Sequence, residues 1–170
     1  MKNLIENILD RYKLNNNAYE LHKKPTDFQN FVDAVLNRTK YLFLDKSQSI
    51  EMIADLNNKT IEIDSLEIER VISNLLSNAC KYSPNGSKIT IKLFEKEDYV
   101  CFSIENKGIG IKNPNLAFDK FMTNNDNSKT LATGLGLFIV REIINAHEGQ
   151  VFIESELNNF TRVTFILPRK

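Results

Sequence analysis

The chain contains 170 residues, a length that suits one domain with a short appendage and can bury a core. Its 22 Lys and Arg residues balance its 22 Asp and Glu residues, so charge indicates neither nucleic acid nor an anionic membrane as a partner. No apolar run approaches the roughly 18 residues of a membrane span, and the start, MKNLIENILDRYK, lacks the apolar region of a signal peptide. We therefore expect a soluble, cytoplasmic chain without membrane contact, whose parent protein could be membrane-anchored. Cys80 and Cys101 lie in apolar stretches and are interpreted as reduced core thiols.

The N-terminal part of the sequence predicts two helices and two strands. Apolar residues at helical spacing predict a short amphipathic helix over residues 2–14, and residues 18–25 look extended. Asp27 can cap a second helix. Strands are expected near 48–55 and 60–63. The apolar side of the second helix consists of Phe28, Phe31, Val32, Val35, Leu36, Thr39 and Leu42.

The central helix is the most informative element of the sequence. Asp64 and Glu67 occupy the N-cap and N3 positions of a capping box, which predicts where the helix begins. The turn Pro84-Asn85-Gly86 predicts where it ends. The expected core face consists of Ile68, Val71, Ile72, Leu75, Leu76 and Ala79.

The C-terminal half of the sequence predicts two antiparallel hairpins. Alternating apolar residues predict one pair of strands over 89–93 and 100–104, and a second pair over 151–154 and 162–167. Strands outnumber the helices that could connect them. This pattern favours the α+β class, as a two-layer α/β sandwich with a mixed, mostly antiparallel sheet and helices on one face.

A long loop and a helix lie between the two hairpins. Residues 106–133 are rich in Gly, Asn, Asp and Thr and show little periodicity. A long loop inside a compact domain is usually a functional lid or a binding loop. A helix is predicted from about 135 to 147, and Gly149 is expected to end it.

Three polar residues, Asn74, Asn78 and Lys81, share one face of the central helix because they are spaced by four and three positions. Amide oxygens are suitable ligands for Mg²⁺, and an ammonium group suits phosphate. Asn is a poor helix former, so two on one face of a core helix are unusual. A solvated polar face is the alternative interpretation of this segment alone.

Three further segments suit a ligand, although each also has a purely structural interpretation. Glu105–Ile111 follows a strand, and its two glycines allow either close approach of a ligand or a tight turn. Thr133–Leu137 opens a helix, whose first N–H groups form an anion site unless the glycines serve as a hinge. Phe118 and Phe121 could anchor a lid or pack within a short helix. Neither glycine pair continues as G-x-G-x-x-G, and no P-loop motif occurs, so a Rossmann unit and a P-loop are not supported.

Taken in order, these segments resemble the sequence boxes of the sensor histidine kinase ATPase domain, in the superfamily of DNA gyrase, the large heat-shock chaperone and the mismatch-repair ATPases. NLLSNACKYSP is similar to the N box, NKGIG to the first glycine box, AFDKF to the F box, TGLGLFIVREIINAHEG to the second glycine box, and TFILP to the last strand. The resemblance covers residues 26–170 and implies the Bergerat ATP-binding fold. LIENILDRYKL is similar to the tail of a dimerisation helix, so residues 1–25 are interpreted as its remnant and a linker.

The resemblance implies a pocket for ATP and Mg²⁺, closed by a lid over residues 112–133. Asn78 would ligate Mg²⁺ beside Asn74, Lys81 would contact phosphate, and these three are the implied catalytic residues. Asn106 occupies the position that reads adenine. The implied nucleotide-binding residues are Asn74, Asn78, Lys81, Tyr82, Asn106, Gly108, Gly110, Ile111, Phe121, Thr133, Gly134, Leu135, Gly136 and Leu137.

The sequence departs from the family pattern at three positions. Asn106 replaces an Asp whose carboxylate accepts a hydrogen bond from the adenine amino group. Charge-assisted bonds contribute about 1.5–3 kcal/mol against about 0.5–1.5 kcal/mol for neutral ones, so we expect ATP affinity about tenfold below that of an Asp variant. Ala132 replaces a common Gly and would stiffen the lid. Glu148 replaces another common Gly and is expected to matter little.

A histidine that could accept phosphate is not apparent in the sequence. His22 lies in the extended link, and His147 ends the second-glycine-box helix, where the family often has a structural His. We therefore expect a monomeric catalytic fragment that does not autophosphorylate alone. It would present the γ-phosphate to a histidine on a dimerisation domain, and a response regulator would be an indirect partner.

Two other functions stay open at this stage. One is a degenerate, non-catalytic nucleotide- or partner-binding module, which the change at Asn106 would permit. The other is a Ser/Thr kinase of the anti-sigma-factor type, against which the helix predicted at residues 2–14 argues. Rapid hydrolysis of ATP is not expected, because Asn74 stands where hydrolysing relatives have a catalytic Glu.

Overall fold

The computed structural model describes residues 20–119 and 135–169 of the chain. The helix predicted at residues 2–14 and the second part of the predicted lid, with Phe121, Ala132, Thr133 and Gly134, lie outside these described residues. The elements, in chain order, are β1 (Lys24–Asp27), α2 (Phe28–Thr39), α3 (Tyr41–Leu44), β2 (Ser49–Asp55), β3 (Thr60–Ile63), α4 (Ser65–Tyr82), β4 (Lys88–Lys96), β5 (Tyr99–Lys107), the 3₁₀ turn η1 (Pro114–Leu116), α5 (Gly136–Ala146), β6 (Gln150–Glu156) and β7 (Phe160–Pro168).

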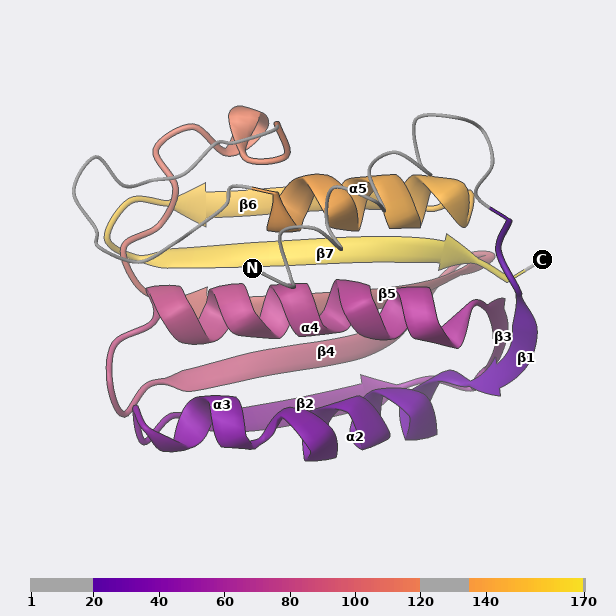
Figure 1. Cartoon of the computed structure of the whole chain (residues 1–170), viewed down its shortest axis with the longest axis horizontal. Helices are drawn as coiled ribbons and strands as arrows, with labels where there is room; N and C mark the ends of the chain where they lie inside the picture. Colours follow the sequence, from indigo (N-terminus) through magenta and orange to yellow (C-terminus); the bar gives the residue numbers. More distant parts are fainter. Residues whose placement is uncertain (1–19, 120–134, 170) are drawn as a thin grey trace.

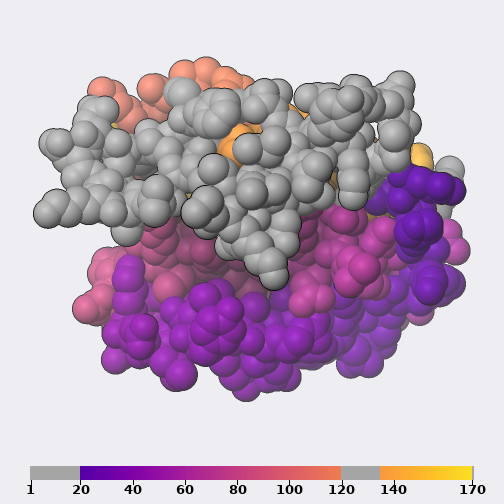
Figure 2. Space-filling model, viewed as in Figure 1, coloured from indigo at the N-terminus to yellow at the C-terminus, as the bar shows by residue number. Residues whose placement is uncertain are grey.

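A five-stranded sheet with helices on one face forms the body of the domain (Figure 1). The strand order is β2-β4-β5-β7-β6, with β2 and β4 parallel and all other neighbours antiparallel. β1 and β3 form a separate antiparallel pair at one end. Helices α2, α4 and α5 cover the sheet, and the space-filling view shows the segment of α2 and α3 as a continuous layer along one edge (Figure 2). The predicted α+β two-layer sandwich with a mixed, mostly antiparallel sheet is confirmed.

Helix α4 lies at the centre of the helical layer, and its predicted core face is confirmed. Every one of those six apolar side chains is buried. On the sheet, Phe102 and Phe165 stack with ring centroids 4.9 Å apart. Full burial of an aliphatic or aromatic side chain contributes about 1.5–3 kcal/mol, so this cluster holds α4 firmly on the sheet, where it lies against β5. No helix within residues 20–119 and 135–169 is long and apolar enough to cross a membrane.

Asp64 caps α4 as predicted, but the capping box is only half formed. The Asp64 side chain accepts hydrogen bonds from the backbone N–H groups of Leu66 (3.1 Å) and Glu67 (3.3 Å). The return bond predicted from Glu67 is absent, because the Asp64 backbone N–H donates to His147 Nε2 at 3.1 Å. Glu67 Oε2 is buried without a hydrogen bond in the described structure and faces Arg70 at 3.7 Å. A histidine from the end of α5 therefore replaces the glutamate of the box.

His147 is a buried, neutral residue that joins the two central helices. Because Nε2 accepts a hydrogen bond from Asp64, the proton must reside on Nδ1, which donates to Ile143 O at 2.8 Å. The side chain is 2% exposed, and its burial lowers the pKa of His147 below the usual value. His147 therefore holds the beginning of α4 against the end of α5 only while its ring is neutral.

The lowered pKa of His147 predicts a loss of stability in mild acid. The unfolded chain takes up a proton near the ordinary pKa of about 6.5, whereas the folded chain does so only at lower pH. The free energy of unfolding should thus fall below pH 6.5, by up to about 1.4 kcal/mol per pH unit. Urea titrations between pH 7.5 and 5.5 would measure this slope, which His147→Gln should flatten. His22→Gln, at an exposed position, is the matched control, and equal slopes in both variants would contradict the prediction.

The end of α5 differs from the prediction. Glu148, and not Gly149, adopts the left-handed conformation after the helix, with φ of 62°. This conformation favours glycine, which accounts for a common Gly at the position of Glu148. Gly149 is required for a different reason, because a Cβ there would lie 2.3 Å from the backbone oxygen of Ile166.

Both cysteines are free thiols held in protein contacts. Cys101 lies on β5 and is 1% exposed, and Cys80 Sγ donates to Leu42 O at 3.0 Å. Burial raises the pKa of both thiols above the usual value. The interpretation of Cys80 and Cys101 as reduced, structural residues agrees with these contacts.

Candidate functional site

The candidate site lies at the end of the domain where α4 and β5 end and α5 begins (Figure 1). Asn74 and Asn78 stand on α4, and Gly136 is the first residue of α5. A Cβ built on Gly136 would lie 3.6 Å from Asn74 Oδ1 and 3.9 Å from Asn78 Nδ2. The fold thus brings the two predicted amides and the predicted helix start together, although they are far apart in the sequence.

The N-terminus of α5 has the features of an anion site among the described residues. Its N-cap residue, Leu135, has no capping side chain, and the first turn carries no acidic residue. Backbone N–H groups at such a helix start, together with the helix dipole, attract negative charge. Leu135 is buried and Leu137 packs against the core. Of the predicted residues here, Leu135 and Leu137 therefore offer backbone groups and Gly136 offers space.

The end of β5 is fixed directly to the end of α4. A Cβ on Gly108 would lie 2.1 Å from the backbone oxygen of Tyr82, closer than any side chain can approach. Asn106 is 7% exposed, and its Nδ2 donates to the backbone oxygen of Lys107 at 3.3 Å. A Cβ on Gly108 would also lie 3.4 Å from Asn106 Nδ2. Glycine at position 108 therefore allows Asn106 and Tyr82 to lie next to each other.

The remainder of the first glycine box is held by the β6–β7 hairpin. Gly110 has φ of 69°, and a Cβ there would lie 2.3 Å from the backbone oxygen of Glu156. The Ile111 N–H donates to Ser155 Oγ at 2.8 Å. Gly110 and Ile111 thus have a defined structural role in fixing the loop, beside the ligand role that the family resemblance implies.

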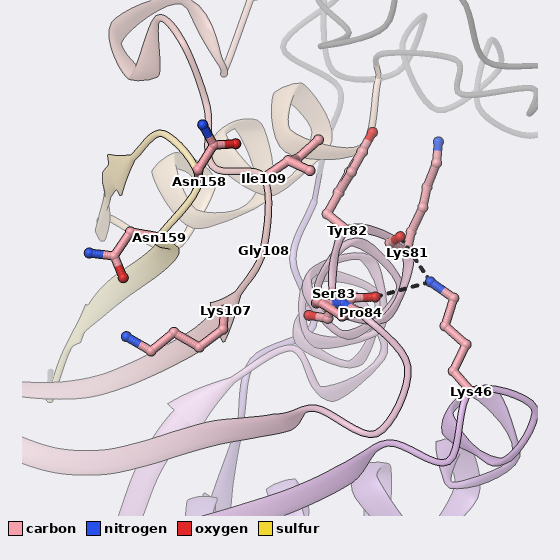
Figure 3. Close-up of a pocket in the computed structure, with 10 residues that line it drawn as sticks. All are labelled: Lys46, Lys81, Tyr82, Ser83, Pro84, Lys107, Gly108, Ile109, Asn158 and Asn159. Carbon is pink, nitrogen blue, oxygen red and sulfur yellow. Dashed lines mark hydrogen bonds between the residues drawn. The ribbon is translucent and has the colours of Figure 1, made fainter.

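A cavity of about 790 Å³ borders this site at the last turn of α4 (Figure 3). Lys81, Tyr82 and Gly108 were predicted from the sequence, and Lys81 Nζ lies 5.0 Å from the Tyr82 ring centroid. The other lining residues come from the α3–β2 loop, the α4–β4 loop, the end of β5 with the residue after Gly108, and the β6–β7 turn. They are Lys46, Ser83, Pro84, Lys107, Ile109, Asn158 and Asn159.

The first part of the predicted lid contacts the body of the domain. Phe118 is 9% exposed, so it packs inward as an anchor or as an ordinary core residue would. Asp119 pairs with Arg141 of α5 at 3.8 Å. These contacts tie the loop after η1 to the helix that begins at the candidate site.

The side chains of the site could hold a metal ion only together with a bound ligand that supplies further oxygen atoms. Residues 20–119 and 135–169 contain no group of three His, Cys, Asp or Glu side chains that could hold a metal ion. Asn74 and Asn78 offer neutral amide oxygens, and Mg²⁺ is commonly held by few protein ligands together with the phosphate oxygens of a nucleotide. Both amides lie beside Gly136, where Asn74 Oδ1 and Asn78 Nδ2 are within 4 Å of the position of a Cβ.

Comparisons with known proteins agree with this arrangement. Residues 63–170 match the family described as histidine kinase-, DNA gyrase B-, and HSP90-like ATPase. The sensor histidine kinase WalK of Bacillus subtilis (strain 168) is 32% identical over the whole chain, which spans 29% of WalK. The adaptive-response sensory kinase SasA of Synechocystis is 32% identical over 99% of the chain and 45% of SasA. The structure of the Acinetobacter baumannii histidine kinase AdeS shares the fold, with a TM-score of 0.83 at 24% identity over 99% of the chain and 78% of AdeS.

The family match covers more than half of the chain and includes α4, the glycine-containing loop after β5, and α5. WalK and SasA, each 32% identical to the chain, are sensor kinases. The predicted family is confirmed, and ATP is the nucleotide that its members' description implies. The chain belongs to the histidine kinase-, DNA gyrase B- and HSP90-like ATPase family and is an ATP-binding catalytic domain of the sensor histidine kinase type.

Proposed function

We propose that this domain binds ATP with Mg²⁺ where α4 meets α5 and transfers the γ-phosphoryl group to a histidine of a sensor-kinase dimerisation segment. One observation carries the proposal. The amides of Asn74 and Asn78 lie within 4 Å of the position of a Cβ on Gly136, at the N-terminus of α5, where no side chain of the N-cap residue Leu135 caps the helix. That arrangement supplies hard oxygen ligands and an anion site in the same place.

The residues of the site would act by positioning and by charge. Bound Mg²⁺ would neutralise phosphate oxygens, with Asn78 as its protein ligand and Asn74 beside it. Lys81 and the first N–H groups of α5 would hold the remaining phosphate charge, while Tyr82 and Asn106 would orient the base. Phosphoryl transfer asks little covalent chemistry of the protein, so such positioning and electrostatics would account for most of the catalysis. With Asn74 in place of a general base, we expect little hydrolysis by water.

The phosphate acceptor is proposed to lie elsewhere, since neither histidine is placed to receive it. Both ring nitrogens of His147 are engaged in hydrogen bonds, and the side chain is buried. His22 lies beside Asp64 at the beginning of α4, whereas the site is at the end of that helix. The reading of residues 1–25 as the tail of a dimerisation helix stays a prediction, as does the response regulator as a downstream partner.

The proposal is tested in two steps. Calorimetry with ATP, with and without Mg²⁺, should give saturable binding that depends on the metal. A separately produced phosphoacceptor hairpin of a sensor kinase, mixed with the domain and γ-labelled ATP, should then become labelled on histidine. Binding without any transfer would favour the non-catalytic module, and phosphoserine on a partner protein would favour the anti-sigma-factor type of kinase.

Asn106→Asp is predicted to bind ATP about tenfold more tightly than the native domain, because a carboxylate makes a charge-assisted bond to the adenine amino group. The same change should lower the stability of the nucleotide-free domain. Asn106 is buried and donates to the Lys107 carbonyl oxygen, which a carboxylate would repel. Calorimetry and thermal melting would measure the two effects. Equal ATP affinity in both proteins would refute the role of Asn106 as the adenine reader.

A further inference from the structure

The last turn of α4 is held by a lysine from the loop before β2. A helix end leaves its final carbonyl groups without partners inside the helix. Lys46 Nζ donates to the backbone oxygen of Cys80 at 2.9 Å. It also donates to the backbone oxygens of Lys81 (3.0 Å) and Ser83 (3.3 Å), as Figure 3 shows. Its charge also complements the negative end of the helix dipole. Lys46 thus fixes the turn that carries Lys81 and Tyr82.

A second side chain of the same loop binds the same turn. Gln48 Nε2 lies 3.1 Å from the backbone oxygens of Cys80, Ser83 and Pro84. The Gln48 side chain is buried, so these bonds are not exchanged for water. Lys46 and Gln48 both donate to the backbone oxygens of Cys80 and Ser83. Two polar side chains therefore hold the same helix end.

The residue between them is strained. Ser47 has φ of 51°, a left-handed conformation that is uncommon for residues other than glycine. The loop is held in place by backbone bonds from Ser47 N to Leu44 O (3.0 Å) and from Gly86 N to Lys46 O (2.8 Å). Strained backbone of this kind gathers at functional sites, where it positions side chains. The strained residue Ser47 lies between Lys46 and Gln48, whose side chains both bind the carbonyl oxygens at the end of α4.

Lys46 lines the cavity, yet its contacts assign it to the helix and not to a ligand. An ammonium group has three N–H donors, and three carbonyl oxygens lie within hydrogen-bond distance of Nζ. Lys46 could therefore reach a phosphate only by releasing α4. Lys81 differs, since its Nζ lies over the Tyr82 ring and extends from the helix that Lys46 holds.

We propose that Lys46 and Gln48 are positioning residues for the nucleotide, acting through the last turn of α4. They hold this turn so that Lys81 and Tyr82 keep the orientation that the nucleotide requires. This inference rests on the proposed function, because it assumes that Lys81 and Tyr82 contact ATP.

The test compares ATP affinity with stability in matched variants. Lys46→Met should raise the Kd for Mg²⁺–ATP about tenfold, measured by calorimetry well below the melting temperature. Lys46→Arg should restore the Kd to within about threefold of wild type, because a guanidinium group can still donate to the same carbonyls. Arg169→Met is the control, since Arg169 donates to the backbone oxygens of Asn58 and Thr60, beside the strand β3 that precedes the beginning of α4 and not its end. This variant should melt earlier with its Kd unchanged.

Each outcome decides between the two claims. If wild type does not bind ATP, the proposed function fails and this inference fails with it. If wild type binds and Lys46→Met matches it within about twofold, the positioning role alone is overturned. An equal loss of affinity in Arg169→Met would also overturn it, since the effect would then be global. If Lys46→Met does not fold, Gln48→Met carries the same test, and failure of both to fold would assign the two residues to the fold alone.

Discussion

Replacing Gly108 by alanine should lower the free energy of unfolding by about 3 kcal/mol, because the added methyl group has no space. Its Cβ would lie 2.1 Å from the Tyr82 carbonyl oxygen and 3.2 Å from the carbonyl carbon. Both atoms belong to the backbone, so no side-chain rotation can relieve the clash. The end of β5 must therefore move away from the last turn of α4, which separates Asn106 from Tyr82 and should weaken ATP binding as well.

Thermal denaturation would measure this effect, with an expected fall in melting temperature of about 6–12 °C for a domain of this size. Gly136→Ala is the matched control. Among the residues that the structure describes outside its own helix, its Cβ would meet no atom closer than 3.6 Å, and alanine favours a helix by up to about 1 kcal/mol over glycine. This variant should melt at or above the wild-type temperature while binding ATP poorly, since its methyl group fills the space beside the two amides. A Gly108→Ala protein that melts like wild type would contradict the packing argument.

Replacing Asn78 by alanine should weaken Mg²⁺-dependent ATP binding about 100-fold, which corresponds to about 2.7 kcal/mol. The change removes the protein oxygen proposed to ligate the metal, and few other hard ligands are present at the site. Stability should change little, because Asn78 is only partly buried and alanine is a better helix former. The effect on ATP binding should therefore appear in a protein that is otherwise intact.

Calorimetry with Mg²⁺ and with EDTA would separate the metal-dependent part of binding from the rest. The weak affinity in EDTA should be the same for Asn78→Ala and wild type, since the metal contact is absent in both cases. Ser77→Ala, at the exposed neighbouring position, controls for a general effect on the helix. If Asn78→Ala keeps its full response to Mg²⁺, the metal ligand must be sought elsewhere.

The parts of the fold that were predicted correctly depend on local patterns. The apolar stripe of α4 repeats with the helical period, and β4 with β5 and β6 with β7 are neighbours in the sequence joined by short turns. The pairing of β1 with β3 and the parallel pairing of β2 with β4 connect distant segments. No periodicity within a single segment carries that information, so these contacts were not predicted.

In the candidate site, too, the residues that a local pattern marks were predicted and the contacts between distant segments were not. Asn74 and Asn78 were recognised because they lie on one helical face, and the glycine pairs because backbone conformation restricts which residues can stand there. The contact of Gly136 with both amides was implied only by resemblance, and Lys46 was missed. Its partners are backbone carbonyls, which every sequence has, so no side-chain pattern marks the contact. His147 was likewise assigned a structural role without its partner, Asp64, being identified.

The two free thiols, one partly buried and one buried, have a practical consequence for labelling chemistry. Maleimides react with the thiolate, and the raised pKa values of Cys80 and Cys101 leave little thiolate at neutral pH. A single added surface cysteine should therefore carry a fluorophore without removal of the native ones. Ile109, which is 47% exposed at the cavity, is a position for a dye that senses occupancy. Leu66, which is 79% exposed in the first turn of α4, offers a reference position at the opposite end of the helix.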